Sequence, residues 1–230
     1  MIGFFDSGVG GFNSLKAFRK ILPLSDVVYL ADSKNAPYGT RTEDEILSLA
    51  AENITRLSQM GAQKVLIACC TASTLWEKLS ISQRNISVPI ILPSIKRLDS
   101  RSKRILVIAT ERTVMSKCFT SGILSLFPEA RVTEVAMQSL VASVEEGTKK
   151  NSLSESTRRD IERLVRLADE YRPDTLILGC THFSSVENLI QEAIPYVKII
   201  NPAHIGAMEM VECVRKYGIN VHENGRIIYT

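Results

Sequence analysis

The sequence predicts an α/β fold made of two pseudo-symmetric lobes with mainly parallel sheets. Short apolar runs rich in β-branched residues alternate with longer amphipathic segments, and this alternation is typical of parallel sheets. A length of 230 residues is enough for one large domain or two small ones. A weak internal repeat, in which IACCTAS (67–73) and ILGCTHF (177–183) each follow an apolar run, indicates two halves of similar design.

Eight apolar runs are predicted to form strands because they are short and rich in valine, isoleucine and leucine. In chain order they are residues 2–5, 27–31, 64–68, 88–92, 104–109, 130–136, 174–179 and 197–200. The two repeated motifs follow the third and the seventh run, so each motif would lie at the carboxyl end of a strand. Open α/β sheets bind their ligands at those ends.

Amphipathic segments between the strands are predicted to form helices. In the segment 42–60, Thr42 and Glu45 have the spacing of a capping box, in which each side chain binds an otherwise unpaired amide. The segment 155–171 carries apolar residues on one stripe and arginines elsewhere, and we interpret the arginines as a solvated face. A helix over 205–218 is expected to pack back on the first lobe.

The polar, basic segment 93–104 shows no regular period, and we interpret it as a crossover between the lobes. The predicted first lobe is therefore 1–92 plus 203–230, and the predicted second lobe is 93–202. A plain surface loop is the alternative interpretation of the same segment.

Composition argues against several classes of protein. The formal charge of +3 is small and dispersed, so no nucleic-acid partner is expected. No apolar run approaches the roughly 20 residues of a membrane span, and no leader segment is expected after Met1. The five cysteines lack the spacing of a disulfide framework, so we expect reduced thiols in a cytoplasmic protein.

The glycine-rich segment FDSGVGG (5–11) follows the first strand. Its glycines permit a tight turn into a helix, whose free amides favour an anion. The segment has neither Gly-Lys-Ser/Thr nor the full GxGxxG pattern, which disfavours a nucleotide and favours a carboxylate or small anion. An equally weighted alternative is a tight turn that Asp6 merely caps.

The segment APYGT (36–40) is predicted to be a turn, because Pro37 presets φ and Gly39 permits the bend. Tyr38 would present its hydroxyl to a ligand there. A loop without a binding role is the favoured alternative from these residues alone.

The cysteines at the two strand ends are candidates for chemistry. Cys69 and Cys70 are adjacent, and Cys180 is followed by His182; this spacing fits neither a metal site nor a CxxC redox site, so no metal is expected. A nucleophilic pair of Cys69 or Cys180 with His182 is possible but leaves the second thiol unexplained. Two thiols facing each other explain both, because inverting a stereocentre requires a base on one face and an acid on the other.

Five motifs carry a resemblance to a known family. They are FDSGVGG (5–11), ADSKNAPYGT (31–40), IACCTAS (67–73), SVEEG (143–147) and LILGCTHF (176–183). In this order and spacing they resemble the motifs of the glutamate racemases, within the aspartate/glutamate racemase superfamily. The resemblance implies a cofactor-independent isomerase that interconverts L- and D-glutamate in a cleft between two lobes. It also implies a supply of D-glutamate for peptidoglycan, and hence for the cell wall and cell shape, and a homodimer.

The resemblance further implies roles for particular residues. Cys69 would remove the α-proton of the D-isomer and Cys180 that of the L-isomer, from opposite faces. Asp6 would support the first thiol, and His182 would assist the second. The implied substrate contacts are Asp6 and Ser7 (amino group), Tyr38 and Gly39 (carboxylate), and Cys70, Thr71, Glu145, Thr181, His182 and Thr113 (remaining wall of the pocket).

One position departs from the family pattern Ala-Cys-Asn-Thr-Ala. Cys70 stands at the position of the family's asparagine, and a thiol is a weaker donor and a poorer acceptor than an amide.

Other functions stay open. One alternative is a racemase for aspartate or another amino acid, and another is a catalytically silent binding protein, for which Cys70 is the only support. A one-thiol isomerase or decarboxylase is disfavoured because both thiols are present. Without the N-terminal extension of some relatives, activation by a cell-wall precursor is not expected.

Overall fold

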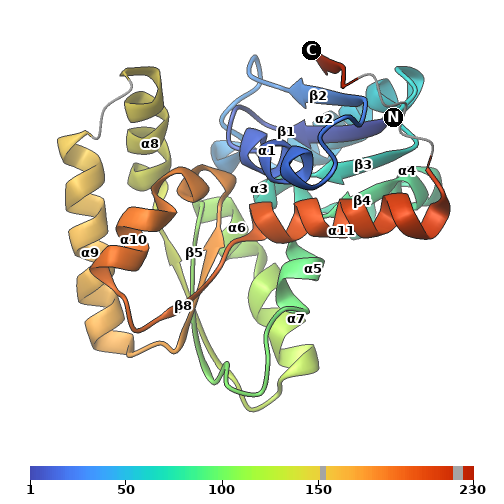
Figure 1. Cartoon of the computed structure of the whole chain (residues 1–230). Coiled ribbons are helices and arrows are strands. Elements are labelled where there is room, and N and C mark those ends of the chain that lie inside the picture. The colour runs from blue at the N-terminus through green and yellow to red at the C-terminus, as the bar shows by residue number, and fades with distance from the viewer. Residues whose placement is uncertain (151–153, 220–224) are drawn as a thin grey trace.

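Two sheets of parallel strands form the centre of the molecule (Figure 1). The computed structural model describes residues 1–150, 154–219 and 225–230, without the side chains of 145–150. The strands are β1 (Ile2–Asp6), β2 (Val27–Ala31), β3 (Lys64–Ile67), β4 (Ser87–Pro89), β5 (Arg104–Ala109), β6 (Arg131–Ala136), β7 (Thr175–Gly179), β8 (Lys198–Ile200) and β9 (Ile227–Tyr229). The first sheet has the order β4-β3-β1-β2-β9 and the second the order β6-β5-β7-β8. The predicted fold class is confirmed.

Helices connect almost every pair of strands, as the alternating pattern predicts. The α-helices are α1 (Phe12–Ile21), α2 (Glu43–Gln59), α3 (Cys70–Ser73), α4 (Ile81–Ile86), α5 (Ile91–Ile95), α6 (Glu111–Ser116), α7 (Cys118–Leu126), α8 (Gln138–Lys150), α9 (Glu155–Tyr171), α10 (Glu187–Ala193) and α11 (Pro202–Tyr217), and the 3₁₀ helices are η1 (Tyr38–Thr40), η2 (Trp76–Lys78) and η3 (Thr181–Val186). The capping box of α2 is present: Thr42 Oγ1 accepts from the Glu45 amide at 3.4 Å, and Glu45 Oε2 accepts from the Thr42 amide at 2.8 Å.

Two predictions about elements are wrong. The apolar run 88–92 is a strand only as far as Pro89, and Ile91–Ile95 form helix α5, which also takes the first residues of the segment predicted to be aperiodic. The hydroxyl of Ser73 accepts from the Ile90 amide at 3.0 Å, which draws that amide out of the strand pairing. Strand β9 was not predicted, although it pairs in parallel with β2.

Three apolar clusters hold the sheets and helices together. One covers the outer face of the first sheet under α2, and includes Ile54 and Ile67. Another covers the outer face of the second sheet under α8, α9 and α10, at the left of Figure 1, and includes Leu164. The central cluster joins Phe18 of the first lobe to Ile177 of the second lobe. Both sheets therefore contribute side chains to one shared core.

The last long helix, α11, packs against α1, α5 and β3 (Figure 1). This agrees with the predicted return of the chain to the first lobe. The lobe boundaries themselves, 1–92 with 203–230 and 93–202, stay a prediction. In the part of the chain that the structure describes, no helix is both long and apolar enough to cross a membrane.

Candidate active site

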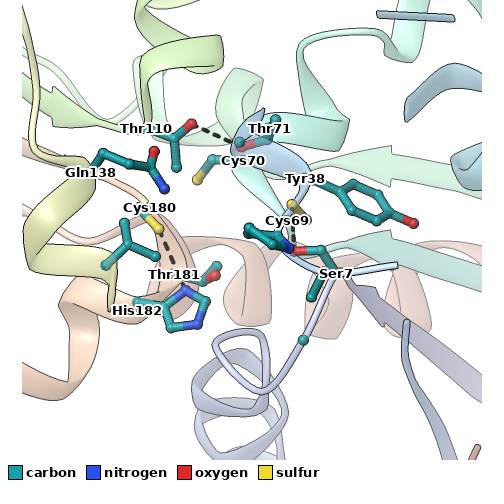
Figure 2. Close-up of a pocket in the computed structure, with 15 residues that line it drawn as sticks. Ser7, Tyr38, Cys69, Cys70, Thr71, Thr110, Gln138, Cys180, Thr181 and His182 are labelled. Carbon is teal, nitrogen blue, oxygen red and sulfur yellow. Dashed lines mark hydrogen bonds between the residues drawn. The ribbon is translucent and has the colours of Figure 1, made fainter. Parts of the chain in front are cut away.

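A narrow cavity lies where the carboxyl ends of the two sheets meet (Figure 2). Its volume of about 30 Å³ holds only a few water molecules. The segments after β1, β2 and β3 contribute Ser7, Gly8, Ala36, Pro37, Tyr38, Gly39, Cys69, Cys70 and Thr71, and the segments after β5, β6 and β7 contribute Thr110, Gln138, Val141, Cys180, Thr181 and His182. Parallel sheets place ligand sites at this edge, and here two such edges share one site.

The thiols of Cys69 and Cys180 enter this cavity from different sheets. Cys69 stands two residues after β3, and Cys180 directly follows β7. The sulfur of Cys69 is 3.4 Å from Ser7 Oγ, and the sulfur of Cys180 is 3.6 Å from His182 Nδ1. Figure 2 shows the two sulfur atoms on opposite sides of the pocket. Each thiol therefore has its own polar partner and its own direction of approach.

The environment of Cys69 favours its protonated form. The side chain is only 5% exposed, and this burial raises the pKa of the Cys69 thiol to about 12. The negative charge of Asp6 contributes to the same shift, while the hydroxyl of Ser7 opposes it. At neutral pH Cys69 is thus a protonated thiol and can donate a proton.

Asp6 is fully buried at the end of β1. Its Oδ1 accepts from the Gly8 amide at 2.8 Å, and its Oδ2 accepts from the Thr181 hydroxyl at 3.2 Å. Burial raises the pKa of this carboxyl group, and the charge of His182 and the Gly8 hydrogen bond oppose that shift. At least one amide of the glycine-rich turn is therefore used by Asp6 itself, which also ties the first lobe to the second through Thr181.

Cys70, the neighbour of Cys69, occupies a different environment. It lines the same cavity but belongs to the central apolar cluster, whereas Cys69 belongs to the cluster under α2. Burial raises the pKa of the Cys70 thiol well above its usual value. Among the described residues, the Cys69 sulfur has a side-chain hydrogen-bonding partner in Ser7, whereas the hydrogen bond to the Cys70 thiol comes from its own backbone amide. This difference supports Cys69 as the functional member of the pair.

The expectation for the Tyr38 hydroxyl is wrong. The hydroxyl donates to Asp32 Oδ2 at 2.6 Å, and Asn53 Nδ2 donates to it at 3.4 Å. Figure 2 shows the ring directed away from the thiols. Tyr38 and Gly39 nevertheless line the cavity, so what they offer a ligand is backbone and ring surface.

Three threonines form a hydroxyl cluster across the lobes. Thr71 Oγ1 lies 3.0 Å from Thr110 Oγ1 and 3.2 Å from Thr113 Oγ1. Thr71 and Thr110 line the cavity, whereas Thr113 is fully buried behind them and supports them instead of lining the pocket as expected. Glu145 falls in α8, and its side chain lies outside the described residues.

Six lining residues were not predicted as contacts: Gly8, Ala36 and Pro37 lie within motifs that the sequence analysis singled out, whereas Thr110, Gln138 and Val141 were missed altogether. Thr110 follows β5 directly and caps α6 through its hydroxyl, which accepts from the Thr113 amide. Threonine is a preferred helix N-cap residue, so its position between a strand and a helix could have indicated Thr110 from the sequence. Gln138 and Val141 lie on α8, and only the tertiary packing of that helix brings them to the cavity.

No cluster of three or more metal-ligating side chains occurs among the described residues.

Two parallel sheets each bring a buried thiol to one shared cavity, an arrangement that suits an isomerase. Residues 14–210 match the family model described as Asp/Glu/Hydantoin racemase. The chain belongs to this family of racemases.

Relatives of known name agree with this family. The glutamate racemase of Gloeobacter violaceus is 37% identical over 212 residues, which cover 91% of this chain and 79% of the relative. Glutamate racemase 3 of Caldanaerobacter subterraneus is 33% identical over 231 residues, with coverage of 98% and 83%.

Solved structures of glutamate racemases share the fold. One from Francisella tularensis, in complex with D-glutamate, has a TM-score of 0.89 at 25% identity and covers 99% of this chain and 86% of that chain. One from Bacillus anthracis has a TM-score of 0.85 at 27% identity, with coverage of 100% and 86%. The whole described fold is therefore that of a racemase of amino acids.

Proposed function

We propose that the protein is a cofactor-independent glutamate racemase that interconverts L- and D-glutamate by proton transfer between two thiols. The observation that carries the proposal is the position of Cys69 and Cys180 on opposite sides of one buried cavity. Support for the substrate comes from relatives named glutamate racemase and from the D-glutamate complex of the Francisella tularensis relative. The product D-glutamate would serve peptidoglycan synthesis, in the cytoplasm, and the protein would act as a homodimer.

In the direction from L- to D-glutamate, the Cys180 thiolate removes the α-proton. The bond pair stays on the α-carbon, and Cys180 becomes a neutral thiol beside His182 Nδ1, at 3.6 Å. Cys69 then gives its proton to the opposite face and becomes the thiolate. The raised pKa of Cys69 suits this step, because the residue enters the reaction as an acid. The reverse reaction exchanges the two roles.

The substrate's ammonium group would lie near Asp6 and Ser7. A positive charge there favours the ionised carboxyl group of Asp6 and the thiolate of Cys69, which burial otherwise disfavours. Because the cavity holds only a few water molecules, the lobes have to separate for glutamate to enter and close again around it.

The proposal is tested with purified protein and each enantiomer of glutamate in deuterated water. Circular dichroism follows loss of optical activity, and proton NMR follows loss of the α-proton signal. Aspartate is run in parallel, because faster racemisation of aspartate would change the substrate assignment. Absence of α-proton exchange for any acidic amino acid would refute the proposed activity and favour a silent binding protein.

Replacing Gly10 by alanine is expected to lower kcat/KM for glutamate about 100-fold. A Cβ at this position would be 2.5 Å from Thr181 Oγ1 and 2.9 Å from His182 Nδ1, so one or both side chains must move. Misplacement of a catalytic group by about 1 Å has an effect of this size. Steady-state kinetics measure the loss. Gly218→Ala controls for general destabilisation, because a methyl group added there would meet no atom within 4 Å, although the φ of 56° strains the backbone of any residue but glycine.

Replacing Cys70 by asparagine is expected to keep kcat/KM for glutamate or raise it up to about tenfold. An amide offers a stronger donor and acceptor than the thiol, and one hydrogen bond to a charged group corresponds to roughly that factor. Cys70→Ser is the matched control, and it should stay far more active than Cys69→Ser. Equal damage from the two serine variants would show that the first base is wrongly assigned.

A further inference from the structure

The cavity between the thiols contains very few nitrogen donors. Among the described side chains that line it, only Gln138 and His182 carry a nitrogen, and none is lysine or arginine. Glutamate brings two carboxylates into this site, and a buried charge without hydrogen-bond partners is strongly unfavourable. Apart from His182, neutral N–H and O–H groups must therefore hold the carboxylates.

Several polar groups of the cavity are already engaged. The Thr71 hydroxyl lies in the threonine cluster, and the Tyr38 hydroxyl donates to a carboxylate outside the cavity. The Ser7 hydroxyl lies against the first thiol, and His182 Nδ1 lies against the second. Among the side chains, Gln138 is left as the source of uncommitted N–H groups.

The carboxamide of Gln138 is anchored through its oxygen. Gln138 begins α8, and its Oε1 accepts from the Glu111 amide at 3.4 Å. An amide N–H can only donate, so the oxygen must face Glu111 and the nitrogen must face the other way. Figure 2 shows that nitrogen pointing into the pocket toward Cys180. No hydrogen bond among the described residues uses it.

The same carboxamide closes the cavity across the lobes. A methyl group at Gly39 of the first lobe would be 3.1 Å from Gln138 Oε1 of the second lobe. On the first-lobe side the cavity offers Cys70, whose thiol is a weak donor. The strong donor therefore comes from the second lobe, which makes ligand binding depend on how the two lobes meet.

We propose that Gln138 is a specificity-determining residue that donates from its side-chain nitrogen to a carboxylate oxygen of the substrate. The inference rests on the proposed racemase function and deepens it. A carboxylate bound between Gln138 and the backbone near Gly39 is held from both lobes, so it favours the closed arrangement in which Cys69 and Cys180 face one α-carbon.

The test compares Gln138→Met, which keeps the length of the side chain and removes both N–H donors, with the wild type. Loss of a hydrogen bond to a charged group is expected to raise KM for glutamate about 10- to 100-fold, with kcat changed less than about threefold. Gln138→Glu should raise KM further at pH 7, because it adds a like charge. Ser139→Ala is the matched control, since the Ser139 hydroxyl donates to Asp160 at 2.6 Å and not to the cavity.

Competitive inhibitors identify the carboxylate. Norvaline keeps the α-carboxylate without a second one, and 4-aminobutyrate keeps only the distal carboxylate. The compound whose inhibition weakens in Gln138→Met carries the group that Gln138 binds, and either result supports the inference. A KM within twofold of the wild type would overturn the inference. A rise in KM that comes with a fall in both kcat and the thermal midpoint would overturn it as well, because it would indicate general damage to the fold. Wild-type protein without any α-proton exchange would instead overturn the proposed function, and this inference with it.

Discussion

Serine in place of Cys180 is expected to lower the rate of glutamate racemisation about 10²- to 10⁴-fold, the range that a positioned acid–base group contributes. A hydroxyl has a far higher pKa than a thiol, so it cannot form the base that removes the α-proton of L-glutamate. His182 lies 3.6 Å from the Cys180 sulfur and stays in place, because the substitution changes one atom. The fold should therefore survive, and circular dichroism should measure the loss of racemisation directly.

Cys69→Ser should lose racemisation to a similar extent but with the opposite preference for enantiomers. With Cys69 absent, Cys180 still removes and returns the proton of L-glutamate, so slow exchange without inversion remains on that enantiomer. With Cys180 absent, the exchange remains on D-glutamate. Proton NMR of each enantiomer in deuterated water separates the two patterns. If both variants exchange the same enantiomer, the two thiols do not act from opposite faces.

The strand ends, and therefore the place of the site, could be predicted from the sequence. The runs before IACCTAS and LILGCTHF are apolar and β-branched, and β3 and β7 form there. Burial in a parallel sheet requires such runs, so local composition fixed this part of the result. The adjacent thiols belong to different apolar clusters, because neighbouring side chains leave a strand end in different directions.

Other parts depended on contacts that no local pattern encodes. The Tyr38 hydroxyl points away from the cavity because it donates to Asp32 and accepts from Asn53, and both of these residues lie outside η1. The run 88–92 looked like one strand because a buried helix turn and a buried strand have the same apolar composition. Gln138 reached the cavity only through the packing of α8 against η3, which the sequence does not display.

Asparagine at position 6 is expected to lower kcat/KM for glutamate at least about 100-fold and at the same time to stabilise the fold at neutral pH. The activity falls because the carboxylate is the charged partner available to the substrate's ammonium near Cys69, and one preorganised electrostatic group has an effect of about this size. The hydrogen bonds survive, since asparagine still accepts from the Gly8 amide and the Thr181 hydroxyl can rotate to accept from the new amide.

The sign of the stability change follows from the pKa of Asp6. Burial raises that pKa above the ordinary value of 3.8, so the folded chain keeps a proton at pH values where the unfolded chain has lost it. The free energy of unfolding contributed by Asp6 therefore falls as the pH rises from the ordinary pKa through the raised one. Asp6→Asn removes this loss of unfolding free energy. The carboxyl group of Asp6 therefore lowers stability while it supports activity, as groups in functional sites commonly do.

Thermal unfolding of the wild type and Asp6→Asn between pH 4 and pH 8 measures the effect. The difference in melting temperature should be small at pH 4 and grow in favour of the variant as the pH rises, by about 2–4 °C for each kcal/mol. A difference that does not change with pH would mean that Asp6 is ionised in the folded protein throughout, held by His182 and by the Gly8 amide. The substrate ammonium would then meet a carboxylate that is already charged, and the loss of activity in the variant would follow from the missing charge alone.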